Sequence, residues 1–145
     1  MELPDEAATE AFGRRLAGRL RPGDALCLSG GLGAGKTTLA RAVIRALTRA
    51  DEEVPSPTFT LMQSYDGRDF AIAHLDLYRL ASAAEVFELG LEEALDTGAA
   101  IIEWPERLGS QLPPDRLDVG LTIQGEGRTA VIAPHGSWIG RDLQF

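Results

Sequence analysis

The sequence predicts a single α/β domain in which helices flank a central mixed β-sheet that ends in a C-terminal β-hairpin. Short apolar runs alternate along the chain with segments of helical periodicity, which is the pattern of an α/β fold. The alternating apolar residues from Leu117 to Ile123, followed by a Gly125-Glu126-Gly127 turn, indicate the hairpin. A length of 145 residues suits one domain with its own core and is too short for two ordinary domains.

The N-terminal third is expected to form helix, strand, loop and helix. Asp5 is a suitable N-cap for a helix over Glu6 to Leu20, which Arg21-Pro22-Gly23 ends. The apolar run Ala25 to Leu28 predicts a buried strand, and helical periodicity resumes from Lys36 to Arg49. One face of this second helix carries Arg41, Arg45 and Arg49, and we interpret it as a solvated face.

The middle of the chain predicts two strands and two short helices. Val54-Pro55-Ser56-Pro57 is expected to be extended, because each proline disfavours helix at the residue before it. Strands over 59–65 and 70–76 flank Asp66-Gly67, a strong signal for a two-residue hairpin turn. The later elements expected are a helix from the capping box Ser82-Ala83-Ala84-Glu85 to Gly90, a helix over 91–95, a strand over 99–102 and the return strand of the hairpin over 128–133.

Composition and charge exclude several classes of protein. Twenty-two acidic residues against 14 basic ones give a net charge of −8, which disfavours autonomous binding of nucleic acid. No apolar run approaches the ~20 residues of a membrane-spanning helix, and the N-terminus lacks the cationic start of a signal peptide. The single cysteine, Cys27, cannot form an internal disulfide, so we expect a cytoplasmic protein.

The segment between the first strand and the second helix carries the strongest motif. Gly30-x-x-x-x-Gly35-Lys36-Thr37 matches the phosphate-binding loop in its required strand–loop–helix context. The glycines let the backbone N–H groups curl around a phosphate, and the helix N-terminus adds its positive dipole end. Lys36 is the only lysine in the chain and stands at the position that contacts the β- and γ-phosphates, while Thr37 offers a hydroxyl to Mg²⁺.

Two carboxylates end predicted strands and could face this loop. Ala99 to Ile102 leads to Glu103, and Phe70 to Leu75 leads to Asp76. Ligands of open α/β sheets bind at the carboxyl ends of strands, so either acid could hold metal or orient water. Each acid alone could equally be an ordinary polar residue that closes a strand.

Side chains near these acids have weaker signals. Ser56, Thr58 and Thr60 lie about twenty residues beyond the phosphate loop and could form a switch segment that senses the γ-phosphate, although a proline turn explains them as well. We interpret His74 as a hydrogen-bonded imidazole of the core. Tyr78 and Arg79 could orient Asp76 or contact a partner.

Four motifs follow one another along the chain: Gly33-Ala34-Gly35-Lys36-Thr37-Thr38-Leu39, Ser56-Pro57-Thr58-Phe59, His74-Leu75-Asp76-Leu77-Tyr78-Arg79-Leu80 and Ile102-Glu103-Trp104. In this order they resemble the bacterial TsaE (formerly YjeE) family, the ATPase subunit of the tRNA threonylcarbamoyladenosine machinery. The resemblance covers about Asp5 to Ala133, and it is most specific in the third and fourth motifs.

The resemblance implies a phosphate-loop ATPase domain over residues 1–133, with residues 134–145 as a tail that we leave unassigned. ATP and Mg²⁺ would be its cofactors, with the catalytic roles on Lys36, Asp76 and Glu103. The phosphates would be held by Leu32, Gly33, Ala34, Gly35, Lys36 and Thr37; the metal and attacking water by Thr37, Asp76 and Glu103; and other parts of the nucleotide by Asp5, Trp104, Glu106 and Arg128.

The resemblance also implies a partner. Family members bind the complex of TsaD and TsaB, and ATP turnover resets that complex between rounds of tRNA modification, so tRNA would be reached only through the partner. Gly31 departs from the family, which commonly has Asp there.

Two other functions use the same loop. A small-molecule kinase would need cations over the transferred phosphoryl group, yet Arg68 and Arg79 are the only arginine or lysine residues between Asp51 and Glu103. A non-catalytic docking module would bind nucleotide without needing the two acids. Phosphate release, or its absence, distinguishes these alternatives from an ATPase.

Overall fold

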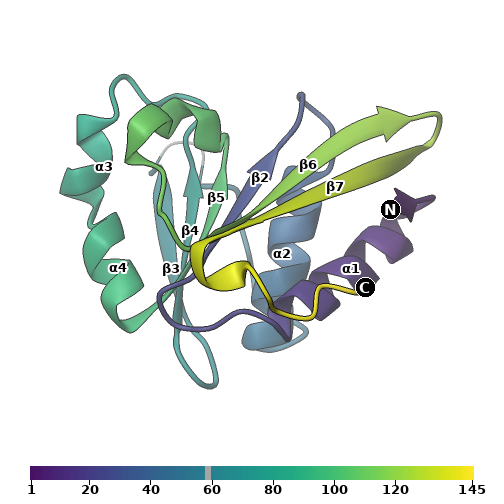
Figure 1. Cartoon of the computed structure of the whole chain (residues 1–145), viewed down its shortest axis with the longest axis horizontal. Coiled ribbons are helices and arrows are strands. Elements are labelled where there is room, and N and C mark those ends of the chain that lie inside the picture. The colour runs from purple at the N-terminus through teal and green to yellow at the C-terminus, as the bar shows by residue number, and fades with distance from the viewer. Residues whose placement is uncertain (58–59) are drawn as a thin grey trace.

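The computed structural model describes residues 1–57 and 60–145 and contains one seven-stranded mixed sheet in the order β1-β7-β6-β2-β5-β4-β3 (Figure 1). The predicted fold class is confirmed. The elements are β1 (Glu2–Leu3), α1 (Glu6–Ala17), β2 (Ala25–Ser29), α2 (Lys36–Leu47), β3 (Met62–Asp66), β4 (Ala71–Asp76), α3 (Ala84–Leu89), α4 (Leu91–Thr97), β5 (Gly98–Glu103), the 3₁₀ segment η1 (Pro105–Gln111), β6 (Arg116–Gln124), β7 (Gly127–His135) and η2 (Gly136–Trp138).

The centre of the sheet is parallel and covered on both faces. Strand β2 pairs in parallel with β5 and β6, and β5 pairs in parallel with β4. Because successive side chains of a strand point to opposite faces, Leu26 and Leu28 join the core under α1 and α2, while Ala25 and Cys27 join the core under α3 and α4. Burial on both faces explains why these strands appear in the sequence as continuous apolar runs.

The predicted two-residue turn at Asp66-Gly67 is wrong. Asp66 is still paired with Ala71, so four residues connect β3 to β4. This connection packs on the C-terminal end of α2: the backbone N–H of Arg68 donates to Leu47 O, and its guanidinium donates to the carbonyls of Ala46 and Thr48. The unpaired carbonyls at the end of α2 therefore select a longer loop than the local sequence favours.

Several predicted ends also differ. Helix α1 ends at Ala17 instead of Leu20, and α2 ends at Leu47 instead of Arg49. Strand β3 begins at Met62, because the backbone N–H of Leu61 bonds to Pro57 O in a turn before it. The end of α3 at Gly90 is as predicted, with Gly90 in the left-handed region at φ 91°.

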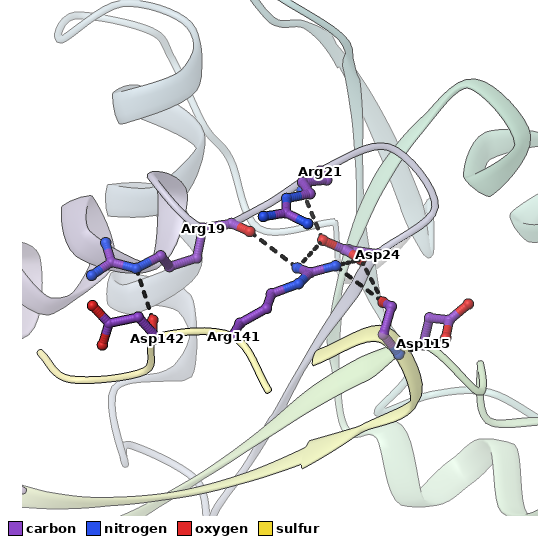
Figure 2. A network of polar contacts seen from close by, with 7 residues as sticks. Arg19, Arg21, Asp24, Asp115, Arg141 and Asp142 are labelled. Carbon is purple, nitrogen blue, oxygen red and sulfur yellow. Dashed lines mark hydrogen bonds and ion pairs between the residues drawn. The ribbon is translucent and has the colours of Figure 1, made fainter. Parts of the chain in front are cut away.

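Both chain termini join the core in ways that the sequence did not predict. Strand β1 pairs with β7, and the Met1 amine donates to Ala130 O. After β7, the tail turns back along α1, where the Trp138 side chain is fully buried and the Phe145 ring meets the Phe12 ring edge-on at 5.4 Å. Figure 2 shows the polar contacts that hold this return, with Arg141 placed against Asp24.

Within the described ranges, no helix combines the length and the apolar character needed to cross a lipid bilayer.

Candidate functional site

The loop between β2 and α2 is shaped by glycines in the left-handed region. Gly30, Gly33 and Gly35 have φ of 143°, 76° and 102°, which L side chains rarely adopt. At Gly30 a Cβ would also lie 2.4 Å from Leu121 O, so β6 leaves no room for a side chain. At Gly31 and Gly33 a Cβ would meet nothing within 4 Å, so there is open space beside the loop at these two positions.

Lys36 is the buried cation of this loop, with 5% of the residue exposed. Its Nζ donates to Gly30 O and Gly31 O, each at 2.7 Å, and lies 4.2 Å from the centre of the Trp104 ring. Burial lowers the pKa of Lys36, although the charges of Glu103, Glu106 and Asp76 oppose that shift. The ammonium therefore lies where an added anion would stabilise its charge.

The two acids that end β4 and β5 lie next to each other across the sheet. Asp76 and Glu103 are register partners on these parallel strands, so their side chains leave the same edge of the sheet. Thr37 Oγ1 donates to Glu103 Oε1 at 2.9 Å, which brings this acid against the start of α2. The Asp76 carboxylate accepts from Tyr78 N at 3.1 Å and from Ser56 Oγ at 3.5 Å.

His74 lies in the core, as predicted, but it also contacts the site, which was not predicted. The His74 ring is buried, and its Nε2 lies 2.6 Å from Glu103 Oε2. A usable signal is the two-residue spacing of His74 and Asp76, which directs both side chains to the same face of β4.

An aromatic pair forms one wall of the site. Trp104 has φ 59°, an uncommon conformation for a residue other than glycine, and its ring centre lies 4.9 Å from that of Tyr78. Together with the loop and the acids, these rings surround a cleft of about 420 Å³. The cleft is lined by Leu32, Gly33, Ala34, Gly35, Lys36, Thr37, Thr38, Asp76, Tyr78, Arg79, Glu103, Trp104 and Arg128.

Arg128, Asp5 and Glu106, which the resemblance also implies in nucleotide binding, lie at the edge of the cleft or outside it. Arg128 on β7 donates to Ala34 O at 3.1 Å and to Gly33 O at 2.9 Å, so it supports the loop from outside. A second hollow of about 220 Å³ contains Arg128 and Asp5, and Asp5 also caps α1 by accepting from Ala8 N at 2.8 Å. Glu106 is exposed on η1, near enough for its charge to affect Lys36.

The segment proposed as a switch is only partly brought to the site. Ser56 contacts Asp76, whereas Thr60 is exposed and accepts a hydrogen bond from Gln63. Thr58 lies outside the described residues.

The arginine face of α2 is not simply solvated, which corrects our interpretation. Arg41 donates to Val54 O at 3.1 Å and Arg45 to Glu52 O at 3.0 Å, and Arg49 pairs with Asp51 and Glu52. These contacts tie the segment that leads to Ser56 to the phosphate-loop helix.

The candidate metal ligands near Thr37 are of the kind that Mg²⁺ binds when phosphate oxygens and water complete its coordination. They are oxygen atoms only: the Thr37 hydroxyl and the carboxylates of Asp76 and Glu103. Over residues 1–57 and 60–145, no three acidic, histidine or cysteine side chains converge into a preformed metal cage. Mg²⁺ commonly keeps several waters and takes one or two protein ligands beside phosphate oxygens, which matches this sparse set.

Comparison with known proteins gives a consistent result. The family described as "Threonylcarbamoyl adenosine biosynthesis protein TsaE" matches residues 3–130. A Rickettsia felis protein named "tRNA threonylcarbamoyladenosine biosynthesis protein TsaE" is 40% identical over 126 residues, which cover 87% of this chain and 74% of the relative. The protein of the same name from Synechocystis is 44% identical over 116 residues, covering 77% and 72%.

A solved structure is similar over nearly the whole fold. The crystal structure of Bacillus subtilis YdiB superposes with a TM-score of 0.77 at 29% identity, covering 94% of this chain and 84% of that one. Because the family match spans most of the sequence and the relatives align along the same span, this chain belongs to the TsaE family.

Proposed function

We propose that the protein binds ATP with Mg²⁺ and hydrolyses it as the ATPase subunit of tRNA threonylcarbamoyladenosine biosynthesis, acting with TsaD and TsaB. The observation that carries the ATPase proposal is the state of Lys36. The only lysine of the chain lies buried at the glycine loop, with a lowered pKa and two carbonyl oxygens as its hydrogen-bond partners. A triphosphate would supply the ion-pair partner that Lys36 does not have within the described residues.

Each residue at the cleft has a role that follows from its chemistry. The loop N–H groups and Lys36 would hold the phosphates, and Thr37 with Asp76 and Glu103 would hold the metal or its waters. When bound, Mg²⁺ would neutralise charge on the phosphates and orient them. Glu103 already accepts from Thr37, and its carboxylate is suited to orient an attacking water.

The partner assignment rests on the names of the relatives, on the resemblance and on charge. The matched relatives are named for tRNA threonylcarbamoyladenosine biosynthesis. A chain with net charge −8 would repel the tRNA backbone, so an ATPase of this family would act on tRNA through TsaD and TsaB.

One contact argues against the kinase alternative. The guanidinium of Arg68 donates to the carbonyls at the C-terminal end of α2, at the opposite end of that helix from the phosphate loop. Of the two arginines between Asp51 and Glu103, only Arg79 lines the cleft. The other arginine at the cleft, Arg128, donates to Ala34 O and Gly33 O, so the cations needed for a phosphoryl-transfer lid are sparse here.

Nucleotide binding can be tested through the single lysine. An amine-selective reagent can modify only Lys36 and the N-terminal amine, so mass spectrometry can follow both in one sample. We expect ATP with Mg²⁺ to protect Lys36 while labelling of Met1 continues as an internal reference. Equal labelling of Lys36 with and without saturating ATP would show that the loop does not bind this nucleotide.

Hydrolysis is tested by phosphate release with and without TsaD and TsaB. We expect slow turnover alone, faster turnover with the partners, and a decrease of about 100-fold or more in Glu103→Gln, which loses the charge that orients water. Glu88→Gln, an exposed acid on α3, is the matched control and should retain the wild-type rate. Phosphorylation of a metabolite without phosphate release would favour a kinase, and binding without hydrolysis a docking module.

A further inference from the structure

We propose that His74 is a positioning residue that anchors one oxygen of Glu103, so that the other oxygen alone is presented to the cleft. This inference rests on the proposed ATPase function for its kinetic consequence, while the contact itself can be tested without nucleotide.

The sheet register places the two groups together. His74 and Asp76 point from the same face of β4, and Asp76 is the register partner of Glu103 on β5. His74 Nε2 lies 2.6 Å from Glu103 Oε2, with 0% and 2% of the two side chains exposed. Both side chains are shielded from bulk water, and the imidazole is the group that pairs with Oε2.

The direction of the hydrogen bond follows from the acceptor. A carboxylate has lone pairs and no proton to give, so His74 Nε2 must carry the proton and donate it to Oε2. The other ring nitrogen, Nδ1, is buried without a hydrogen-bond partner among the residues that the structure describes. The ring is therefore positioned by packing, and Glu103 is its one polar contact there.

Burying an imidazole with one unpaired nitrogen costs free energy, and a position with a purely structural role does not require that cost. A leucine would avoid the unpaired Nδ1, but it would leave Glu103 Oε2 buried without its donor, so the imidazole accepts one cost in order to pair this oxygen. Such a cost is typical of residues that are kept for a site.

The two oxygens of Glu103 thus have different partners. Oε2 is fixed from behind by His74, and Oε1 faces the cleft and accepts from Thr37 at 2.9 Å. Without the imidazole, the carboxylate could rotate about its side-chain bonds and offer either oxygen. Because a misplacement of about 1 Å can lower a catalytic rate by about 100-fold, this anchoring supports turnover more than nucleotide binding.

The kinetic test compares His74→Leu with His74→Gln. Leucine removes the donor, and glutamine restores an N–H on a side chain of similar reach. We expect His74→Leu to lower kcat for partner-stimulated ATP hydrolysis by about 10- to 100-fold, the usual effect of losing an orienting hydrogen bond to a site residue. We expect ADP affinity to change less than about twofold, because the phosphate loop is intact, and His74→Gln to recover most of kcat.

The contact itself is tested by nitrogen-15 NMR of the wild-type protein without nucleotide. The chain has only two histidines, so His135→Asn identifies the His74 signals. We expect a slowly exchanging proton on Nε2 that is shifted downfield by the carboxylate.

Three outcomes would overturn the proposal: a proton on Nδ1 alone, wild-type kcat in a folded His74→Leu, or a loss in folded His74→Gln as large as in His74→Leu. Failure of the proposed function is a separate result, because absent hydrolysis in the wild type would leave the NMR signature in place.

Discussion

One buried charged residue lies beyond each end of strand β2, and the two differ in whether the protein supplies an ion-pair partner. Asp24, just before the strand, is 2% exposed and is surrounded by donors from its own chain. It accepts from Arg141 at 2.7 and 3.0 Å, from the backbone N–H of Arg21 at 2.8 Å and from Ser137 Oγ at 3.3 Å (Figure 2). The tail supplies two of these three partners.

Lys36, beyond the other end of β2, is buried to a similar degree but has no ion pair within the described residues. Its hydrogen bonds end on two neutral carbonyls, and burial lowers its pKa. A buried charge that is fully paired by its own chain therefore maintains the fold, whereas a buried charge without an ion-pair partner is available to a ligand.

Removing the ion pair between Asp24 and Arg141 should have the largest effect on stability. Asp24→Asn removes the counter-charge of Arg141 and leaves a buried guanidinium, so we expect the free energy of unfolding to fall by about 3–5 kcal/mol. Urea unfolding measures this change. The matched control is Arg21→Ala, which keeps the backbone N–H that contacts Asp24 and should change stability by less than about 0.5 kcal/mol. Equal stability of Asp24→Asn and wild type would show that the pair does not maintain the fold.

The opposite substitution should separate binding from stability. Lys36→Met keeps the length of the side chain and removes a charge that the fold holds at a disfavoured pKa, so stability should not fall. ATP affinity should fall by about 100-fold or more, which corresponds to about 2.7 kcal/mol or more. Calorimetry on both variants gives the contrast: folded Asp24→Asn should still bind ATP, and Lys36→Met should not. Retained ATP affinity in Lys36→Met would contradict the idea that the charge of Lys36 serves a ligand while the charge of Asp24 maintains the fold.

The smallest expected effect concerns Cys27, midway along β2. Burial, with a smaller contribution from the charge of Asp118, raises the pKa of this thiol to about 12. Between pH 9 and 12 the unfolded thiol ionises while the folded one does not, so stability falls as pH rises. From pH 8 to pH 10 the loss through this group is about 1.4 kcal/mol. The free energy of unfolding, measured against pH, should fall by that much more in the wild type than in Cys27→Val. The same pH dependence in both proteins would contradict the raised pKa of Cys27.

The candidate site was predictable where its signals are local. The loop from Gly30 to Thr37 is defined by residue spacing, and its glycines adopt the positive φ values that the motif requires. Asp76 and Glu103 were predicted to end strands, and they do, because apolar runs that are buried on both faces are recognisable in the sequence.

Other parts of the molecule depend on contacts distant in the sequence. The connection after Asp66 is longer because it packs on the end of α2, and Trp138 becomes part of the core only when the tail packs against β6 and α1. His74 looks like any core imidazole until β5 places Glu103 beside it, 29 residues later in the chain.

The class of fold, the phosphate loop and the acids that follow the strands can be predicted from the amino-acid sequence, because these depend on periodicity and spacing within a few residues. The pairing of the buried charges, the oxygen of Glu103 that is anchored and the way both termini join the sheet are established only by the folded chain. Those features depend on which strands become neighbours, and neighbours are selected by burial of the whole core rather than by any short stretch of sequence.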